Sequence, residues 1–355
     1  MTREPGAGGP AGRRVSHAWV ESPLQLLGAV EAFAAGLLGQ RAQILAYRGL
    51  PGLAATADAV TRLGLPAGLG FDPAGPPWSI LRGAARREPV WAVGDPHSLP
   101  VQARAVALTG AERVLLLDDG LGTAGVIGRL ADPAAPPLIR EHVAQPRWRH
   151  ALGGAASRRL RDLARAGRLG ALTAFPVEPG VAAAFRAAGG RLGHHRFDWL
   201  RGRPAAAPPP EETVVLGSAL AVDGLIDPVR YHAWVAGIAG AATGGTAYLP
   251  HRRERPAELA GALPDGVRLV RTELPVELTL RALREPQRVI GLPGTALATL
   301  PLVLAGGGAR VEAAAIPGDW WTGRATPEFR ALTARAAAMG GTRPGAAPTS
   351  IRYQA

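Results

Sequence analysis

Apolar segments typical of β-strands alternate along the chain with segments typical of amphipathic helices, and this alternation limits the possible folds more than any other feature. It predicts a parallel sheet that is covered by helices. In the first half we expect strands at residues 15–21, 42–47, 90–93, 113–117 and 171–175 and a helix at 24–38. In the second half we expect strands at 213–216, 246–249, 267–270, 289–292 and 311–315, with helices at 228–241, 256–262, 275–283 and 296–304.

A proline-rich segment interrupts the alternation. Residues 201–212 read RGRPAAAPPPEE, in which consecutive prolines exclude a helix and favour a stiff, extended spacer. We therefore expect a first domain at residues 15–200 and a second at 213–355, with residues 1–14 as a disordered tail. The length of 355 residues fits two domains of roughly 100–200 residues each. The predicted fold class is α/β, with two Rossmann-like domains facing each other across a cleft.

The net charge of +12 comes entirely from arginine, because the 40 basic residues include no lysine and outnumber the 28 acidic ones. Such a surplus attracts anionic partners such as nucleotides, anionic lipids or polyanionic glycans. We do not expect a nucleic acid partner, because aromatic residues make up only 5% and no basic segment is interleaved with residues that stack on bases. The absence of cysteine excludes disulfides, thiolate metal sites and a cysteine nucleophile.

The chain shows no signal peptide, and its most apolar run, residues 296–308, is too short for a membrane span. We therefore expect a cytoplasmic protein. Residues 147–168 hold seven arginines and one acid, Asp162, so this window carries +6, half of the net charge. A solvated helix face explains the window. The functional alternative is peripheral contact with the anionic inner face of the cell membrane, or with a polyanionic glycan.

Ligands of open α/β sheets bind beyond the carboxyl ends of the strands, so the residues that follow each strand are the candidates for a site. The first strand runs into Ser22, which can cap the next helix, with Pro23 at the first helical position. A helix start alone explains these residues. Alternatively, Ser22 and Gln25 point into the cleft and bind an anion at the helix N-terminus.

Two adjacent acids, Asp118 and Asp119, follow the strand at 113–117, and Gly120 permits a sharp turn after them. Repulsion between the two carboxylates can raise one pKa toward the range that suits a general base. The alternative is an acidic turn with a helix cap. We expect no metal site, because neighbouring residues of an extended chain point to opposite faces and no third ligand lies nearby.

Gly120, Gly122 and Gly125 form a literal GxGxxG pattern, which indicates dinucleotide binding when it lies in the first turn between a strand and a helix. Here it lies in a late turn, and the two acids before it would repel a pyrophosphate. We interpret the pattern as a coincidence in a glycine-rich chain. An NAD(P)-dependent oxidoreductase is accordingly the third of three function classes.

In the second half, Gly217 and Ser218 follow the first strand and are typical of a turn beside a nucleotide. The next strand ends in His251 and two arginines, Arg252 and Arg253. A histidine beside two arginines at a strand end can form a phosphate-binding corner, although a histidine there can equally cap a helix or bind a backbone carbonyl.

A glycine and a threonine, Gly294 and Thr295, follow the strand at 289–292 and precede the helix at 296–304. The backbone amides of this helix N-terminus and the threonine hydroxyl suit a single phosphate.

Five short motifs occur in a fixed order: SPLQLL at 22–27, DDG at 118–120, GS at 217–218, PHRRE at 250–254 and GTAL at 294–297. In this order they resemble the bacterial sialyltransferase and polysialyltransferase families, which share an acidic Asp/Glu-Asp/Glu-Gly motif, a His-Pro motif and a later Ser/Thr motif. The resemblance spans about residues 15–320. Arg252 stands where the family usually has proline, and Pro293 stands where a serine is often found.

The resemblance implies the GT-B arrangement of two facing Rossmann-like domains, inversion at the anomeric carbon, and no metal or other required cofactor. The implied donor is a CMP-activated nonulosonic acid such as CMP-sialic acid, and the acceptor is a glycan or glycolipid of the cell surface. A glycosyltransferase of this kind is the first function class. A non-catalytic nucleotide- or glycan-binding relative of the same fold is the second.

Carried over residue by residue, the resemblance assigns Asp119, or its neighbour Asp118, as the base that takes the proton from the acceptor hydroxyl. Some relatives place the base after the first strand of the second domain, where this chain offers Asp223. Replacement of each Asp by Asn distinguishes these candidates.

The family's other roles concern the donor. The resemblance assigns His251 as a donor to the departing CMP phosphate, and Thr295 with the Gly294 turn as further phosphate ligands. Glu277 resembles an acidic position that contacts the nucleotide. The alternative is an exposed glutamate in the first turn of a helix, where the helix dipole favours it.

Overall fold

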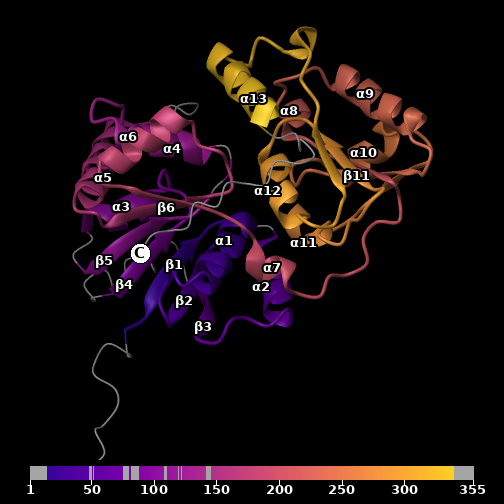
Figure 1. Ribbon diagram of the computed structural model, residues 1–355. Coiled ribbons are helices and arrows are strands. Elements are labelled where there is room, and N and C mark those ends of the chain that lie inside the picture. The colour runs from indigo at the N-terminus through magenta and orange to yellow at the C-terminus, as the bar shows by residue number, and fades with distance from the viewer. Residues whose placement is uncertain are drawn as a thin grey trace, which may run out of the picture. The chain divides into compact units, whose positions relative to one another are not determined.

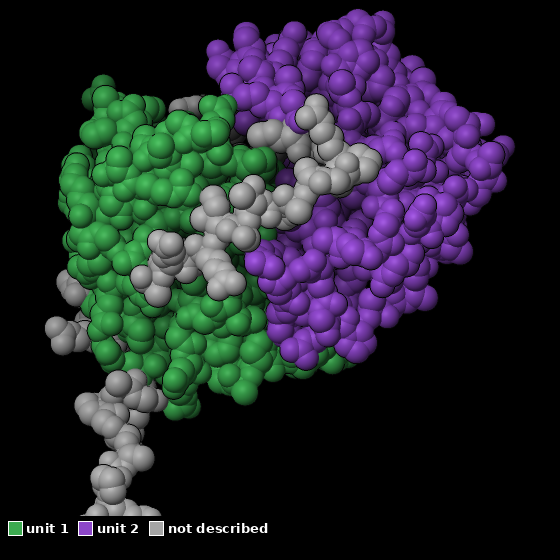
Figure 2. All heavy atoms as spheres, in the orientation of Figure 1, with its two compact units in different colours: residues 1–195, 351–355 green, residues 196–350 purple. Residues whose placement is uncertain are grey.

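The computed structural model describes residues 14–47, 50, 52–74, 80, 88–107, 110–118, 120, 122–140 and 145–339. These residues divide into two compact units, 14–195 and 196–339 (Figure 2). The chain thus enters the second unit at Arg196, and the proline-rich segment 201–212, which we expected to separate the domains, belongs to the second unit. Apart from Arg14, the expected N-terminal tail lies outside the described residues.

Within its described residues, the first unit contains seven strands that pair in parallel in the order β3-β2-β1-β4-β5-β6-β7 (Figure 1). The strands β1 to β7 are Ser16–Val20, Ala42–Tyr47, Leu69–Ala74, Glu88–Val93, Ala111–Leu116, Leu169–Thr173 and Arg191–His194. The helices α1 to α6 are Pro23–Ala34, Leu53–Arg62, Leu99–Ala107, Gly122–Ala131, Arg147–Arg165 and Pro179–Ala187. The strand order reverses between β1 and β4, which is the switch point where open α/β sheets bind ligands.

Both faces of this sheet are covered. On one face, Trp19 of β1 and Trp91 of β4 pack in a single apolar cluster with side chains of α3, α4, α5 and α6. The connections from β1 through β2 to β3 step toward one edge of the sheet, and those from β4 to β7 step toward the other edge. Because such connections are right-handed, α1 and α2 lie on the face opposite to this cluster. Burial on both faces explains the continuous apolar strands, such as β6, in which all five residues are buried.

The second unit contains a smaller parallel sheet of five strands among its described residues, in the order β10-β9-β8-β11-β12. The strands β8 to β12 are Thr213–Leu216, Thr246–Leu249, Val267–Leu269, Arg288–Gly291 and Arg310–Ala313. The helices α7 to α13 are Asp198–Arg201, Ala219–Val222, Pro228–Ala241, Pro256–Ala262, Val276–Thr279, Thr295–Val303 and Pro327–Met339. Here the order reverses between β8 and β11.

Alternate residues of β8 pack into two different clusters, which shows that helices cover both faces of the second sheet as well. Val214 and Leu216 pack with side chains of α12, whereas Val215 packs with side chains of α9 and α10. The α/β class and the two Rossmann-like sheets are therefore confirmed. The facing arrangement of the two domains stays a prediction.

Two edge strands, β3 and β7, were not predicted. Strand β3 contains Gly70 and Asp72, residue types that strands usually avoid, so local sequence carries little strand signal there. The helix expected at 24–38 ends at Ala34, since Gly36 adopts a left-handed conformation with a φ of 77°. Among the described helices, none is both long and apolar enough to cross a membrane.

Candidate functional site

Asp118 lies just beyond the end of β5 and is completely buried, with 0% of its surface exposed. Its Oδ1 atom accepts hydrogen bonds from the Gly120 N–H (3.2 Å) and the Thr123 hydroxyl (2.7 Å). Its Oδ2 atom accepts from the Thr173 hydroxyl (3.1 Å) and the Ala174 N–H (2.6 Å). Burial raises the pKa of Asp118, although the four hydrogen bonds act in the opposite direction. Asp118 therefore ties the turn after β5 to the end of β6, and both of its oxygens are saturated.

Asp119 lies outside the described residues, so its role as a base stays a prediction. Gly120 next to it has a φ of 95°, in the left-handed region that favours glycine. Gly122 and Gly125, by contrast, have open space where a Cβ would be added. In a dinucleotide-binding turn the third glycine allows close packing of the helix on the strand, and Gly125 at this place makes no such contact. The geometry therefore favours the interpretation of the GxGxxG pattern as a coincidence.

Ser22 and Gln25 lie at the switch point of the first sheet and are both bonded within the protein. The Ser22 hydroxyl accepts the Gln25 N–H (3.2 Å) and caps α1, with Pro23 at the first helical position. Gln25 is 1% exposed, and its Oε1 atom accepts the Glu21 N–H (2.6 Å). Its side chain packs so closely on Gly94 that a Cβ there would lie 1.9 Å from the amide carbon. The helix-start alternative is thus sufficient for both side chains.

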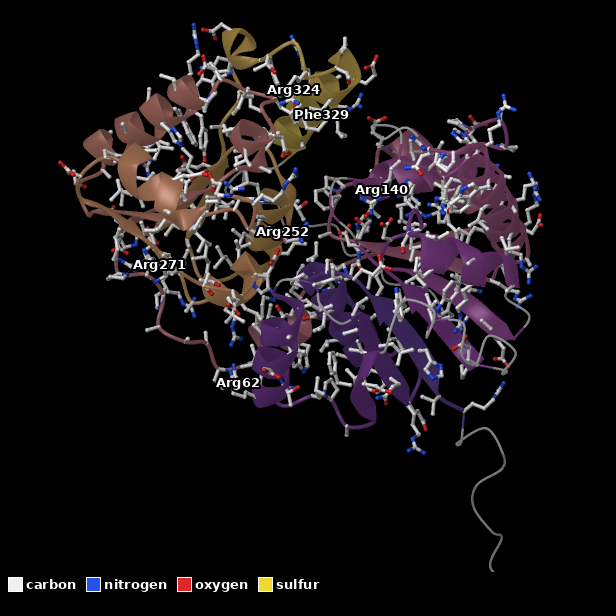
Figure 3. The ribbon with its side chains drawn as sticks, turned by 180° about the vertical axis from the view of Figure 1, so that it is seen from behind. Arg62, Arg140, Arg252, Arg271, Arg324 and Phe329 are labelled. Atoms are coloured by element: carbon white, nitrogen blue, oxygen red, sulfur yellow. The ribbon has the colours of Figure 1, made fainter. Side chains whose placement is uncertain are left out.

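A polar cluster that sequence reasoning missed lies after β4. Asp95 is 3% exposed, and its Oδ1 atom accepts the His97 N–H (2.8 Å) and lies 3.2 Å from Nδ1 of the same histidine. Arg140, which is labelled in Figure 3, binds the other oxygen. Burial opposes ionisation of Asp95, but the hydrogen bonds and charge of His97 and the charge of Arg140 outweigh it and lower the pKa. A carboxylate thus orients the partly exposed ring of His97, as suits a proton-transfer group.

His195 is a second polar residue that sequence reasoning missed. It follows β7, is 3% exposed, and its backbone N–H donates to the Thr173 carbonyl (2.9 Å). Its ring packs against α1, where a Cβ added to Gly28 would lie 3.3 Å from Nε2. Burial, and then the charge of His194, lowers the pKa of His195 to about 4. His195 is therefore a neutral histidine of the core at neutral pH. For both missed histidines the only sequence signal was a position just after a strand.

In the second unit, the turn after β8 packs directly on the turn after β9. A Cβ added to Gly217 would lie 2.0 Å from Oε2 of Glu254 and 2.5 Å from the backbone nitrogen of His251, so only glycine fits. Glu254 is 8% exposed, and it accepts the His251 N–H (2.7 Å) and the Tyr248 hydroxyl (2.7 Å). Burial raises the pKa of Glu254 despite these bonds. Ser218 caps α8 through its hydroxyl. The structure thus brings together Gly217, Ser218 and His251.

The ring of His251 has a defined protonation pattern. Its Nδ1 atom lies 3.2 Å from the backbone nitrogen of Arg253, which can only donate, so Nδ1 is the acceptor. The neutral ring then carries its proton on Nε2. Burial, followed by the charges of Arg252 and Arg253, lowers the pKa of His251 to about 4, while Asp223 acts in the opposite direction. At neutral pH His251 is a neutral hydrogen-bond donor.

The two arginines after His251 differ in their partners. Arg253 forms an ion pair with Asp223, the C-cap residue that follows α8. The neighbouring Arg324 donates a long hydrogen bond (3.5 Å) to the Asp223 carbonyl. Arg252, which Figure 3 labels, is exposed and pairs with none of the described acids. Arg252 therefore presents an uncompensated positive charge beside the His251 ring. Among the described residues, no group of three or more His, Asp and Glu side chains is arranged to hold a metal.

Gly294 and Thr295 lie at the neighbouring strand end, directly at the switch point of the second sheet. Gly294 is the N-cap of α12 and Thr295 is its first residue. Glu277 of α11 is 3% exposed, and its Oε1 atom accepts a hydrogen bond (2.5 Å) from the Thr299 hydroxyl of α12. The alternative of an exposed Glu277 is wrong, because the four-residue helix α11 turns this side chain inward onto α12. Its contact with a nucleotide stays a prediction.

The arginine-rich window 147–168 covers α5 and the turn after it. Three of its arginines donate hydrogen bonds to backbone carbonyls. Arg149 binds the carbonyl of His97, and Arg161 binds the carbonyls of Arg129 and Ala135. Arg168 binds the carbonyls of Ala111 and Glu112. Arg165 pairs with Asp162. Arg147 and Arg158 are exposed, as is Trp148, at 56%. Contact with an anionic membrane stays a prediction, for which these side chains and the exposed Arg165 are the candidates on α5.

No family model matches the chain, and no curated protein matches it. Solved structures of similar architecture include a UDP-glucosyltransferase of Polygonum tinctorium in complex with 3,4-dichloroaniline, at 12% identity and a TM-score of 0.47 over 84% of this chain and 79% of that one. Another is UGT2 of Phytolacca americana with UDP-2-fluoroglucose and pterostilbene, at 10% identity and a TM-score of 0.48 over 90% and 82%. The spinosyn rhamnosyltransferase SpnG follows at 14% identity and a TM-score of 0.36 over 91% and 83%. At these values the likeness concerns the fold alone.

Proposed function

We propose that this chain is an inverting glycosyltransferase that moves a nonulosonic acid, such as sialic acid, from a CMP-activated donor to a hydroxyl of a glycan or glycolipid. The observation that carries the proposal is the pairing of a neutral Nε2–H donor on His251 with the uncompensated charge of Arg252 at the carboxyl end of β9. A directed donor beside a fixed positive charge suits the single phosphate of a cytidine monophosphate. We name this pair the phosphate corner.

The chemistry of the leaving group follows from the phosphate corner. When the bond between the sugar and CMP breaks, negative charge grows on the phosphate oxygen. Groups that are already oriented toward that charge stabilise the transition state without reorganisation. The Arg253 N–H fixes the tautomer of the His251 ring, and Glu254 accepts the backbone N–H of His251, so the Nε2–H donor needs no change of tautomer to act. The amides at the start of α12 and the Thr295 hydroxyl are the further phosphate ligands of the proposal. Arg252, in the place of the family's proline, adds a charge.

For the acceptor we propose Asp119 as the base that takes the hydroxyl proton, a role that contributes roughly 10²–10⁴ in rate. Two observations favour it over the other acids. Asp118 has both oxygens saturated by donors, and Asp223 is engaged by Arg253. Among the described residues a further candidate is His97, which Asp95 orients.

A transfer assay tests the proposal. The full chain is incubated with CMP-activated nonulosonic acids and an oligosaccharide acceptor, and the release of CMP and the glycosylated product are measured. We expect release that depends on the acceptor and falls at least about 100-fold in Asp119→Asn. The His97→Ala variant is expected to retain turnover. Binding of CMP without turnover of any donor would instead identify the non-catalytic relative, and turnover of a UDP-sugar would refute the CMP assignment.

A further inference from the structure

A cavity of about 310 Å³ lies in the second unit at the C-terminal end of α12. Four arginines line it and no acid does. Arg201 and Arg203 come from the end of α7 and the segment after it, whereas Arg281 and Arg284 come from the segment between α11 and β11. The last residues of α12 and the glycine-rich turn at 304–307 complete the wall. We call this space the arginine cavity. Its volume is at the lower end of the range for small-molecule sites.

The positive charge of the arginine cavity is largely uncompensated. Arg201 pairs with Asp198, but no described acid pairs with Arg203, Arg281 or Arg284. Four guanidinium groups minus one carboxylate leave a local charge of +3. Positive charges held close together in a concave site repel one another, and an anion that enters the site relieves the repulsion.

Hydrogen bonds to backbone carbonyls explain the position of some of these side chains. Arg281 donates to the carbonyls of Leu200 (3.1 Å), Arg203 (3.1 Å) and Pro204, which clamps it to the segment after α7. Arg284 donates to the carbonyl of Leu283 (2.9 Å). A carbonyl satisfies a donor but carries no net charge, so these bonds leave the charge of the arginine cavity unchanged.

The Nε atoms of Arg203 and Arg281 are fully buried and have no hydrogen-bond partner among the described residues, so they do not face the open space of the cavity. The guanidinium of Arg203 lies 5.2 Å from the centre of the Trp199 ring, which holds its plane in place. The cavity thus combines oriented arginines with surplus positive charge.

We propose that the arginine cavity binds a small, soluble anion that carries phosphate groups, at a site separate from the phosphate corner. Guanidinium groups recognise phosphate oxygens through paired, charge-assisted hydrogen bonds, which fits both the charge and the donors present. The two sites lie toward opposite ends of α12, because Gly294 and Thr295 begin this helix and Val303 and Leu304 at its end line the cavity. The inference goes beyond the proposed function and does not depend on it.

Calorimetric titration of the full chain with inorganic pyrophosphate tests the proposal. The double variant Arg203→Gln/Arg284→Gln removes two charges and keeps the clamp made by Arg281. We expect its dissociation constant for pyrophosphate to rise at least tenfold. Arg230→Gln, which removes an arginine exposed on α9, is the matched control and is expected to change the constant less than twofold. Equal constants in all three proteins would overturn the proposal.

Two further measurements distinguish a soluble anion in the arginine cavity from an anion bound elsewhere and from a lipid headgroup. If Arg252→Gln, and not the double variant, weakens pyrophosphate binding, the anion binds at the phosphate corner and the proposal is refuted. Cosedimentation with phosphatidylglycerol vesicles measures lipid binding, and loss of vesicle binding in the double variant would overturn the assignment to a soluble ligand. The single variants and the melting temperature of each protein show whether a loss of binding arises from unfolding.

Discussion

The backbone N–H of Arg253 donates a hydrogen bond to Nδ1 of His251 across 3.2 Å. This contact places the ring proton on Nε2 and makes the side chain a donor. The backbone N–H of His251 in turn donates to the buried carboxylate of Glu254, and the absence of a side chain on Gly217 leaves room for that carboxylate. The turns after β8 and β9 therefore cooperate to present one N–H group at the carboxyl end of β9.

The protonation of His251 can be measured directly. Because burial and the adjacent arginines lower its pKa to about 4, we predict that the ring titrates with a midpoint near 4 in the folded protein. Nuclear magnetic resonance of selectively labelled histidine gives the midpoint, and the His251→Gln variant assigns the signal. A midpoint of 6.5 or above would contradict the neutral-donor role.

Because the ring of His195 is buried and neutral, we predict that the free energy of unfolding falls in acid. The pKa of His195 is about 4 in the folded protein, against about 6.5 in the unfolded chain. Between these values the unfolded state binds a proton that the folded state does not, so the free energy of unfolding falls as the pH is lowered from 6.5 to 4. A shift of this size corresponds to roughly 3 kcal/mol.

Melting temperatures between pH 7 and pH 4.5 check this prediction. His195→Asn, which cannot titrate, is expected to show a shallower decline than the wild type, although it is less stable at pH 7. His150→Asn, at an exposed position of α5, is the control and should follow the wild type. A decline in His195→Asn as steep as that of the wild type would show that other groups cause the acid sensitivity.

We predict that replacement of Asp118 lowers the stability of the protein, whereas replacement of Asp119 lowers its turnover. In the wild type each carboxylate oxygen of Asp118 accepts two hydrogen bonds. In Asp118→Asn an amide NH₂ group replaces one of these oxygens and leaves its two buried donors unsatisfied, which destabilises the protein by roughly 1–3 kcal/mol. The melting temperature should fall by several degrees. Asp119→Asn should keep the melting temperature and lose turnover. The opposite pattern would exchange the roles of the two acids.

Glycine is predicted to be essential at position 217. In Gly217→Ala the new methyl group would meet the Glu254 carboxylate and the His251 backbone nitrogen, so we expect destabilisation of roughly 1–3 kcal/mol and weaker binding of CMP. Gly125→Ala is the matched control, because a methyl group there meets open space within α4. That variant should be as stable as the wild type or more stable, by up to roughly 1 kcal/mol. Unchanged CMP binding in Gly217→Ala would contradict the packing described for the two turns.

The strands and helices of the second unit were the most predictable part of the fold. Strands β8 and β9 and helices α9 and α10 have the bounds that the sequence predicts. Local signals explain this success, since Pro228 and Pro256 mark the helix starts and Asp227 caps α9. The rule that sites follow strand ends also selected Gly217, His251 and Thr295, which the structure places at one edge of the second sheet.

The missed features depend on contacts between distant parts of the chain. Arg140 reaches Asp95 from a segment far along the sequence, and no local pattern near either residue indicates that pairing. Glu277 sits on a four-residue helix, which is too short for periodicity to reveal its buried side. The saturation of Asp118 likewise requires the end of β6, which only the folded sheet brings beside it.

Calorimetric titration of the full chain with CMP, and in parallel with UDP, GDP and NAD, tests the central claim most directly. We predict that CMP binds at least tenfold more tightly than the other nucleotides and that His251→Ala weakens CMP binding at least tenfold, which equals about 1.4 kcal/mol. Preferential binding of UDP or NAD, or CMP binding that is indifferent to His251, would contradict the assignment of the phosphate corner to a CMP-activated donor.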